Sequence, residues 1–333
     1  MKTYKFMDFC AGIGGGRLGL ELNGMECIAH AEIDEKTAYV YSQIYKDDNN
    51  YGDITQIDKP SLPDFDILIS GFPCQTFSIV GKRAGFEDDR GLIINHLIEI
   101  LECKNVPYFV LENVKGLVNH DRGRTLRIIL SELDKAGYNT YHKVLNSIDY
   151  GVPQMRERIY IVGAKKDLNF NFNFPKPILH NHISEYLIDE NARELPLHDA
   201  TFHKYLNNKY NQGQYDLDAI LEQDYLIIDT RQSDLRLYKD RCPTLRTGRH
   251  GILYVKNGKL KKLSAIEALL LQGFPMDIAS KAMEVGIEEN KLLSIAGNAM
   301  TVNVIEHIGR ELINTINSPE EHDEIGEQLC LQI

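Results

Sequence analysis

One cysteine lies where a nucleophile could work. Cys74 follows Pro73 in the segment 71–78, and this segment comes directly after an apolar run at residues 66–70. In open α/β proteins, ligands bind beyond the carboxyl ends of the sheet strands, and the fixed φ of a proline restricts how the next residue is presented. A thiolate there is a credible nucleophile. A single cysteine is also a common structural residue, so its neighbours have to decide its role.

Further polar residues are expected at the same edge. Glu112 directly follows another apolar run, and a carboxyl group there can hydrogen-bond a ring nitrogen and an exocyclic amine of a heterocycle. Arg156 and Arg158 stand two residues apart before a third apolar run, where they could anchor a base carbonyl and the cysteine loop, or pair with surface acids. The charged segment 81–91, bounded by glycines, has the composition of a lid that closes over a substrate.

A glycine-rich turn at residues 10–16 predicts a nucleoside site. Its glycines let the backbone turn tightly and approach a ligand. Glu32 follows the turn in the sequence at a separation that allows its carboxylate to accept hydrogen bonds from ribose hydroxyls of a ligand bound at the turn. Asp53 and Ile54, expected at the end of a third short strand, offer an acid and an apolar wall for adenine. The turn also fits the dinucleotide fingerprint formally, so it leaves NAD and S-adenosylmethionine both open.

The elements that must position these residues alternate in type. Because strands that alternate with helices form parallel sheets covered on both faces, we predict an α/β protein with a doubly wound, mostly parallel sheet. The predicted strands are 4–9, 26–31, 66–70, 108–111 and 158–163, and the predicted helices are 16–23, 35–45, 92–103 and 124–136.

The pattern changes near residue 165. Polar, weakly periodic sequence continues to about residue 230, and helical patterns return at 264–272 and 302–316. We therefore predict a catalytic domain over 1–194, a smaller inserted domain over 195–278, and a C-terminal segment, 279–333, that returns to the first domain. The length of 333 residues fits this division, at about 150 residues per domain.

Composition narrows the functional class. The net charge of −11 argues against a basic coat, but residues 231–262 hold ten lysines and arginines against two acids, a local surface suited to phosphates. No apolar run approaches the roughly 18–20 residues of a membrane span. The six cysteines lie far apart without metal-ligand spacing. We therefore expect no disulfide scaffold, no metal site and a cytoplasmic location.

In their order, these motifs resemble the DNA (cytosine-5)-methyltransferases of bacterial restriction–modification systems. Pro-Cys-Gln and Glu-Asn-Val are the most specific of them. The resemblance implies an S-adenosylmethionine-dependent methyltransferase fold with a smaller target-recognition domain, and it selects S-adenosylmethionine as the cofactor. The matching segments are 6–16, 32–34, 53–54, 71–78, 112–114, 154–158, 241–246 and 297–299.

The resemblance implies a covalent mechanism. Cys74 would attack carbon 6 of cytosine, Glu112 would bind ring nitrogen 3 and the amino group, Arg158 would hold the base carbonyl, and Arg156 would support the cysteine loop. The adduct makes carbon 5 nucleophilic enough to take the methyl group, after which the carbon 5 proton is removed and Cys74 leaves by elimination. Because stacking buries carbon 6, the base must first flip out of the duplex.

A cofactor site and DNA contacts are also implied. The partner would be double-stranded DNA, the protein a monomer away from membranes, and a cognate restriction endonuclease would be encoded separately. Cys10 and Ile33 depart from the aromatic residues common in the family, which would weaken stacking on the cofactor modestly. The implied cofactor residues are Cys10, Ala11, Gly12, Gly14, Gly15, Glu32, Ile33, Asp53, Ile54, Pro73, Ile93, Asn298 and Ala299, and the implied phosphate contacts are Arg241, Arg246 and Arg249.

Three alternatives are weaker. A tRNA cytosine-5 methyltransferase shares the fold and mechanism, but its Cys-Phe-Thr signature does not occur in this sequence. A nicotinamide-dependent oxidoreductase leaves Cys74 and Glu112 without a role, and a non-catalytic DNA-binding relative would not need the nucleophile with its partners. The sequence thus predicts a DNA methyltransferase, with loops at about 165–240 that read base edges in the major groove.

Overall fold

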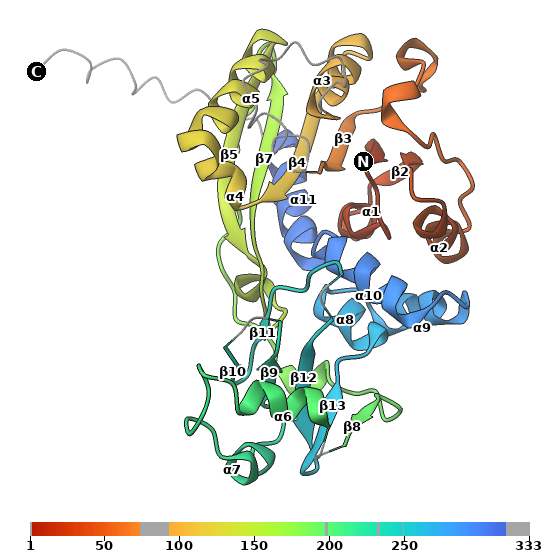
Figure 1. Ribbon diagram of the computed structural model, residues 1–333. Coiled ribbons are helices and arrows are strands. Elements are labelled where there is room, and N and C mark those ends of the chain that lie inside the picture. Colours follow the sequence, from red (N-terminus) through yellow and green to blue (C-terminus); the bar gives the residue numbers. More distant parts are fainter. Residues whose placement is uncertain (1, 74–92, 197–198, 232–233, 249, 318–333) are drawn as a thin grey trace, which may run out of the picture.

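A central six-stranded sheet carries the candidate site (Figure 1). The computed structural model describes residues 2–73, 93–196, 199–231, 234–248 and 250–317. The strand order is β2-β1-β3-β4-β7-β5. The neighbours from β2 to β4 are parallel, and β7 is antiparallel to both β4 and β5. The strands are β1 (Lys5–Phe9), β2 (Glu26–Ala31), β3 (Ile67–Gly71), β4 (Tyr108–Val114), β5 (Tyr138–Asn146) and β7 (Glu157–Lys165).

Helices cover both faces of this sheet. Along β3, Ile67 and Ile69 pack with α1 and α11, whereas Leu68 packs with α3 and α5 on the opposite face. Side chains of a strand alternate between faces, so a strand with both faces buried is apolar throughout. The helices around the sheet are α1 (Gly15–Glu21), α2 (Glu35–Tyr45), α3 (Ile93–Cys103), α4 (Gly116–Asn119), α5 (Arg124–Lys135) and α11 (Val302–Asn317).

A second, antiparallel sheet of five strands lies at the other end of the molecule (Figure 1). Its order is β10-β9-β12-β13-β8. Helices α6 and α7 pack on it around a separate core cluster that includes Phe202, Ile228 and Leu253. The elements are β8 (Glu194–Leu195), α6 (Ala200–Leu206), α7 (Leu217–Leu221), β9 (Ile227–Asp229), β10 (Arg236–Tyr238), β12 (Ile252–Lys256) and β13 (Lys259–Lys262).

Three helices lie between the two sheets, α8 (Ala265–Leu271), α9 (Met276–Glu284) and α10 (Glu289–Asn298) (Figure 1). Their apolar residues share one core cluster with α2 and β12. A short parallel pair, β6 (Gln154–Met155) and β11 (Cys242–Pro243), makes a second connection between the two parts. The two sheets are therefore joined by a packed and hydrogen-bonded junction rather than by a bare linker.

The doubly wound, mostly parallel sheet predicted from sequence is confirmed. The short strand predicted to end at Asp53 is wrong: Asp53 instead caps a 3-10 helix by accepting the N–H of Thr55. Strand β5 is missing from the sequence predictions because its half-exposed polar residues hide the apolar pattern. The five-stranded sheet spans residues 194–262, and the domain boundaries remain predictions. The 3-10 helices are η1 (Ile54–Gln56), η2 (Lys59–Ser61), η4 (His120–Gly123), η5 (Ser147–Tyr150) and η6 (Ile183–Glu185).

The contact of α1 with α11 requires glycine at position 19. A Cβ atom there would lie 2.6 Å from Cβ of Ile305. We expect Gly19→Ala to lower the free energy of unfolding by about 1–3 kcal/mol through overpacking, measured by urea denaturation. The control is Gly116→Ala, where the nearest atom is 3.8 Å away. Equal stabilities of the two variants would contradict the close helix contact.

Candidate active site

The carboxyl ends of β3 and β4 meet β7 at one place on the sheet. Gly71 pairs with Glu112 in register, and Glu112 lies opposite Tyr160. Nε of Arg158 is 3.1 Å from Oε1 of Glu112, with side chains only 13% and 10% exposed. This oxygen is buried and accepts no well-directed hydrogen bond from the described residues. The pair therefore presents an acceptor that a ligand can satisfy.

Asn113 connects this pair to the segment that leads to the predicted nucleophile. Its buried side-chain amide donates to the carbonyl of Phe72 at 2.9 Å, so the start of the Pro-Cys loop is tied to the end of β4. Pro73 is exposed at this point. Cys74 lies outside the described residues, as does the predicted lid at 81–91. Glu112 and the residues immediately before Cys74 thus share one edge of the sheet.

The four cysteines that the structure describes are poor candidates for the nucleophile. Burial raises the pKa of Cys10, Cys27 and Cys242 to about 12, which keeps these thiols protonated and unreactive at neutral pH. Cys103 is exposed, but it ends α3, which returns the chain to the start of β4. That position is at the opposite edge of the sheet from Glu112.

The glycine turn after β1 holds a carboxylate in a fixed position. Gly12 and Gly14 have left-handed backbones, with φ of 57° and 85°. Oε2 of Glu32 accepts the N–H of Gly12 at 2.9 Å, and Oε1 accepts the N–H of Asp34 at 2.8 Å. Each oxygen retains a lone pair. Glu32 can therefore still accept hydrogen bonds from the two hydroxyls of a ribose.

The surroundings of this turn suit a nucleoside. Ile33 next to Glu32 is 68% exposed, so its apolar side chain is accessible to a ligand. The raised pKa of the Cys10 thiol is caused mainly by burial, and Glu32, Asp8 and Asp53 add to it, which brings these carboxylates near the turn. Ile54 is buried in the core, and Ile93 is half-buried at the start of α3, which packs against η1.

A segment from the far end of the chain closes the turn. A Cβ atom on Gly15 would collide with the carbonyl oxygen of Met300, so only glycine fits this contact. Asn298, which is exposed, and Ala299, which is buried, directly precede Met300. The structure thus places Gly15 of the turn against Met300, the residue that follows Asn298 and Ala299, while the cofactor role of these residues stays a prediction.

Comparison with known proteins identifies the family. The family model for the C-5 cytosine-specific DNA methylase matches residues 4–314.

The chain belongs to the C-5 cytosine-specific DNA methylase family.

Curated relatives agree along the whole chain. Type II methyltransferase M.HaeII of Haemophilus aegyptius is 38% identical over 320 residues, covering 95% of each chain. Type II methyltransferase M.HhaI of Haemophilus parahaemolyticus is 34% identical over 322 residues, covering 94% of this chain and 95% of its own. The protein is therefore a DNA (cytosine-5)-methyltransferase, as the motifs predict. These relatives make the tRNA alternative the less supported one.

Solved structures share the fold. Spodoptera frugiperda DNMT2 aligns with a TM-score of 0.68 at 19% identity, covering 93% of this chain and all of its own. The Entamoeba histolytica methyltransferase EhMeth aligns with the same score at 18% identity, covering 94% of this chain and 99% of its own. At such identities the likeness concerns the fold alone.

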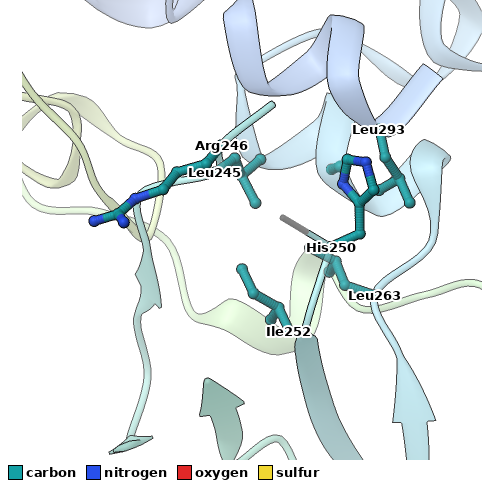
Figure 2. Close-up of a pocket in the computed structure, with 7 residues that line it drawn as sticks. Leu245, Arg246, His250, Ile252, Leu263 and Leu293 are labelled. Atoms are coloured by element: carbon teal, nitrogen blue, oxygen red, sulfur yellow. The ribbon is translucent and has the colours of Figure 1, made fainter. Parts of the chain in front are cut away.

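The basic stretch of this methylase is partly neutralised. Arg231 forms a buried pair with Asp229 at 2.7 Å and donates to the carbonyl of Thr244, so it is a structural residue. Arg241 and Arg246 are exposed and form no ion pair with any residue that the structure describes. Figure 2 shows the side chain of Arg246 extending away from the apolar residues of a pocket beside it. Arg249 lies outside the described residues.

The sequence does not predict a group of side-chain contacts that supports the glycine turn of the methylase from behind. The Tyr45 hydroxyl lies 3.0 Å from the carbonyl of Gly14, and the Arg17 guanidinium lies over the Tyr45 ring. Tyr41 stacks on the buried ring of His30, with ring centroids 3.9 Å apart. The position of Arg17 directly after the glycines could have indicated a contact near the turn. Nothing in the sequence indicates that α2 packs against the turn.

The buried His30 makes the stability of the methylase sensitive to acid. Burial lowers the pKa of His30 to about 4 from 6.5, so the folded protein keeps the ring neutral while the unfolded chain takes up a proton. Stability due to this group is complete above pH 6.5 and is lost as the pH falls towards 4. We expect His30→Phe, which retains the stacking, to be relatively more stable at pH 5 than at pH 7 by about 2 kcal/mol. Urea denaturation at both pH values measures this, and parallel profiles would contradict it.

Proposed function

We propose that this methylase transfers a methyl group from S-adenosylmethionine to carbon 5 of a cytosine flipped out of duplex DNA, through a covalent adduct on Cys74. The observation that carries the proposal is the pairing of Glu112 with Arg158 at the sheet edge where the Pro-Cys loop begins. A carboxyl group beside a guanidinium suits one edge of a cytosine, which has an amino group, a ring nitrogen and a carbonyl in a row. The high pKa values of the buried Cys10, Cys27 and Cys242 argue against these three thiols as the nucleophile.

In this mechanism Glu112 binds ring nitrogen 3 and the amino group, and Arg158 holds the carbonyl. These contacts stabilise the charge that develops as the Cys74 thiolate forms a bond to carbon 6. S-adenosylmethionine, when bound, supplies the methyl group from a sulfonium. Loss of the carbon 5 proton then breaks the bond between sulfur and carbon 6, which returns the free cysteine. The cost of flipping is a few kcal/mol, which contacts to the DNA backbone offset.

The proposed cofactor site lies around the glycine turn. Glu32 accepts hydrogen bonds from the ribose, and Ile33 covers one face of adenine. Asp53 retains a carboxylate oxygen besides Oδ1, which accepts the N–H of Thr55, and can meet the adenine amino group. The remaining wall consists of the residues already named in the resemblance, namely Cys10, Ala11, Gly12, Gly14, Gly15, Ile54, Pro73, Ile93, Asn298 and Ala299.

The proposed DNA surface includes Arg241, Arg246 and Arg249. Arg241 and Arg246 are exposed and form no ion pair with any residue that the structure describes, and such guanidinium groups are suited to phosphates. We propose that the protein acts as a monomer in the cytoplasm, within a restriction–modification system whose endonuclease is a separate chain. The names of its Type II relatives support that setting. None of the helices in the described part of the chain is long and apolar enough to cross a membrane.

The nucleophile is tested by trapping. A duplex with 5-fluorocytosine at the target should form a denaturation-resistant complex with the wild-type protein in the presence of S-adenosylmethionine, because fluorine blocks the final elimination. Cys74→Ser should form none, and Cys103→Ser should trap as the wild type does. Denaturing gel electrophoresis measures the complex. A trapped complex with Cys74→Ser would refute the assignment.

The role of Glu112 is tested by separating catalysis from cofactor binding. We expect Glu112→Gln to lower kcat on the order of 100-fold, since transition-state charge loses its partner, without a matching change in the Kd for S-adenosylmethionine. Glu157→Gln is the control, because Glu157 is exposed and pairs with Lys115. Rapid-quench kinetics and calorimetry provide the two readouts. Equal losses in both would contradict the proposed role.

A further inference from the structure

The proposed function assigns no role to Gln154, although this residue is fully buried between the two sheets. Its Nε2 donates to the carbonyl of Leu271 at 2.9 Å and to Oε1 of Gln272 at 3.1 Å. Its Oε1 accepts the N–H of Leu245 at 3.1 Å. A backbone carbonyl only accepts and a backbone N–H only donates, so these partners fix the orientation of the amide. Both the nitrogen and the oxygen of the Gln154 amide are therefore hydrogen-bonded.

The hydrogen bonds continue from Gln272 into a closed ring. Nε2 of Gln272 donates to the carbonyl of Ala296 at 2.6 Å, and its Oε1 accepts the Thr301 hydroxyl at 3.0 Å. The Thr301 and Ser147 hydroxyls lie 2.8 Å apart, and the backbone N–H of Ser147 donates to the carbonyl of Arg156 at 3.0 Å. Since all of these side chains are buried, each bond is strengthened by the low local dielectric, and the ring resists deformation.

Arg156 makes a second bridge across the junction. Its guanidinium donates to the carbonyls of Leu245, Gly297 and Ala299 at 3.2, 3.0 and 2.9 Å. Two of these carbonyls belong to the C-terminal end of α10, where the helix dipole favours a cation. Burial lowers the pKa of Arg156 to about 9.

Leu245 is thus held at both backbone groups, its N–H by Gln154 and its carbonyl by Arg156. Its side chain lines the pocket shown in Figure 2, and the preceding Thr244 hydroxyl donates to the carbonyl of Met155 at 2.6 Å. Upstream, Cys242 and Pro243 pair with β6. The segment 241–246, which carries two of the proposed phosphate contacts, is therefore fastened to residues 154–156.

We propose that Gln154 is a positioning residue that sets the 241–246 segment, and the DNA bound to it, relative to the Glu112–Arg158 pair. The chain from Gln154 reaches Arg158 in four residues, and the bridges of Arg156 extend the same frame to Gly297 and Ala299 beside the cofactor turn. Contact of Arg246 with a phosphate then fixes where the target base meets Glu112. This inference rests on the proposed function.

The first test replaces the amide by an apolar side chain of similar size. Gln154→Leu frees the N–H of Leu245, and we expect the single-turnover rate of DNA methylation at saturating DNA and cofactor to fall roughly 10- to 100-fold, because small displacements of a reacting group cost that much. The Kd of the free protein for S-adenosylmethionine should not change. The control is Gln223→Leu, which removes one hydrogen bond, to the carbonyl of Ala219, away from the junction.

Gln154→Glu supplies a readout that a loss of stability alone would not give. The introduced carboxylate would face two acceptors, the carbonyl of Leu271 and Oε1 of Gln272, and only its protonated form can donate to either of them. The single-turnover rate of this variant, divided by that of the wild type, should therefore rise as the pH is lowered from 8 to 6. This variant also carries the test if Gln154→Leu does not fold.

The outcomes separate the two claims. Wild-type protein that transfers no methyl group to duplex DNA overturns the proposed function and the positioning role with it. Wild-type methylation accompanied by an unchanged rate for folded Gln154→Leu, or by a rate ratio for Gln154→Glu that is flat with pH, overturns the positioning role alone. A reduced rate for Gln154→Leu at unchanged cofactor Kd, with a ratio that rises in acid for Gln154→Glu, supports it.

Discussion

The register of β3, β4 and β7 is the constraint on which the site depends. Gly71, Glu112 and Tyr160 lie side by side across these strands, and Arg158, two residues from Tyr160, pairs with Glu112. A shift of one residue in either pairing would turn Glu112 to the other face of the sheet. The buried ion pair is tolerated because the charges of the guanidinium and the carboxylate compensate each other. Removal of one partner would leave an uncompensated buried charge. The register of these strands therefore places Glu112 and Arg158 side by side before any substrate binds.

Distant parts of the chain hold the second half of the site. The glycine turn near residue 14 is closed by Met300 and braced from behind by Tyr45. Lys291 of α10 pairs with Asp34 at 2.7 Å, which fastens the C-terminal helices to the start of α2. The same helices bear the hydrogen bonds from Gln272 and Arg156. The glycine turn, the Glu112–Arg158 pair and the 241–246 segment are thus all connected to one packed and hydrogen-bonded junction, which suits the proposed alignment of two substrates.

Local patterns predict five of the six strands of the central sheet, β1, β2, β3, β4 and β7, but not β5. Apolar runs that end in Glu112 or lead to Pro73 predict strands and identify their carboxyl ends. The contacts of Arg156 were not predictable, because its partners are backbone carbonyls at 245, 297 and 299, and no rule for one sequence gives such distant pairs. Asp53 illustrates another limit: an acid two residues before a threonine fits a cap as well as a strand end.

The central claim is that the buried pair Glu112–Arg158 receives an extruded cytosine. The most direct measurement is a crystal structure of the protein with duplex DNA that carries 5-fluorocytosine at the target, grown with S-adenosylmethionine. The account predicts the base outside the helix, its ring nitrogen 3 and amino group within hydrogen-bond distance of Glu112 and its carbonyl beside Arg158. A target base that stays stacked in the DNA, or that binds elsewhere while this pair contacts no nucleotide, would contradict it.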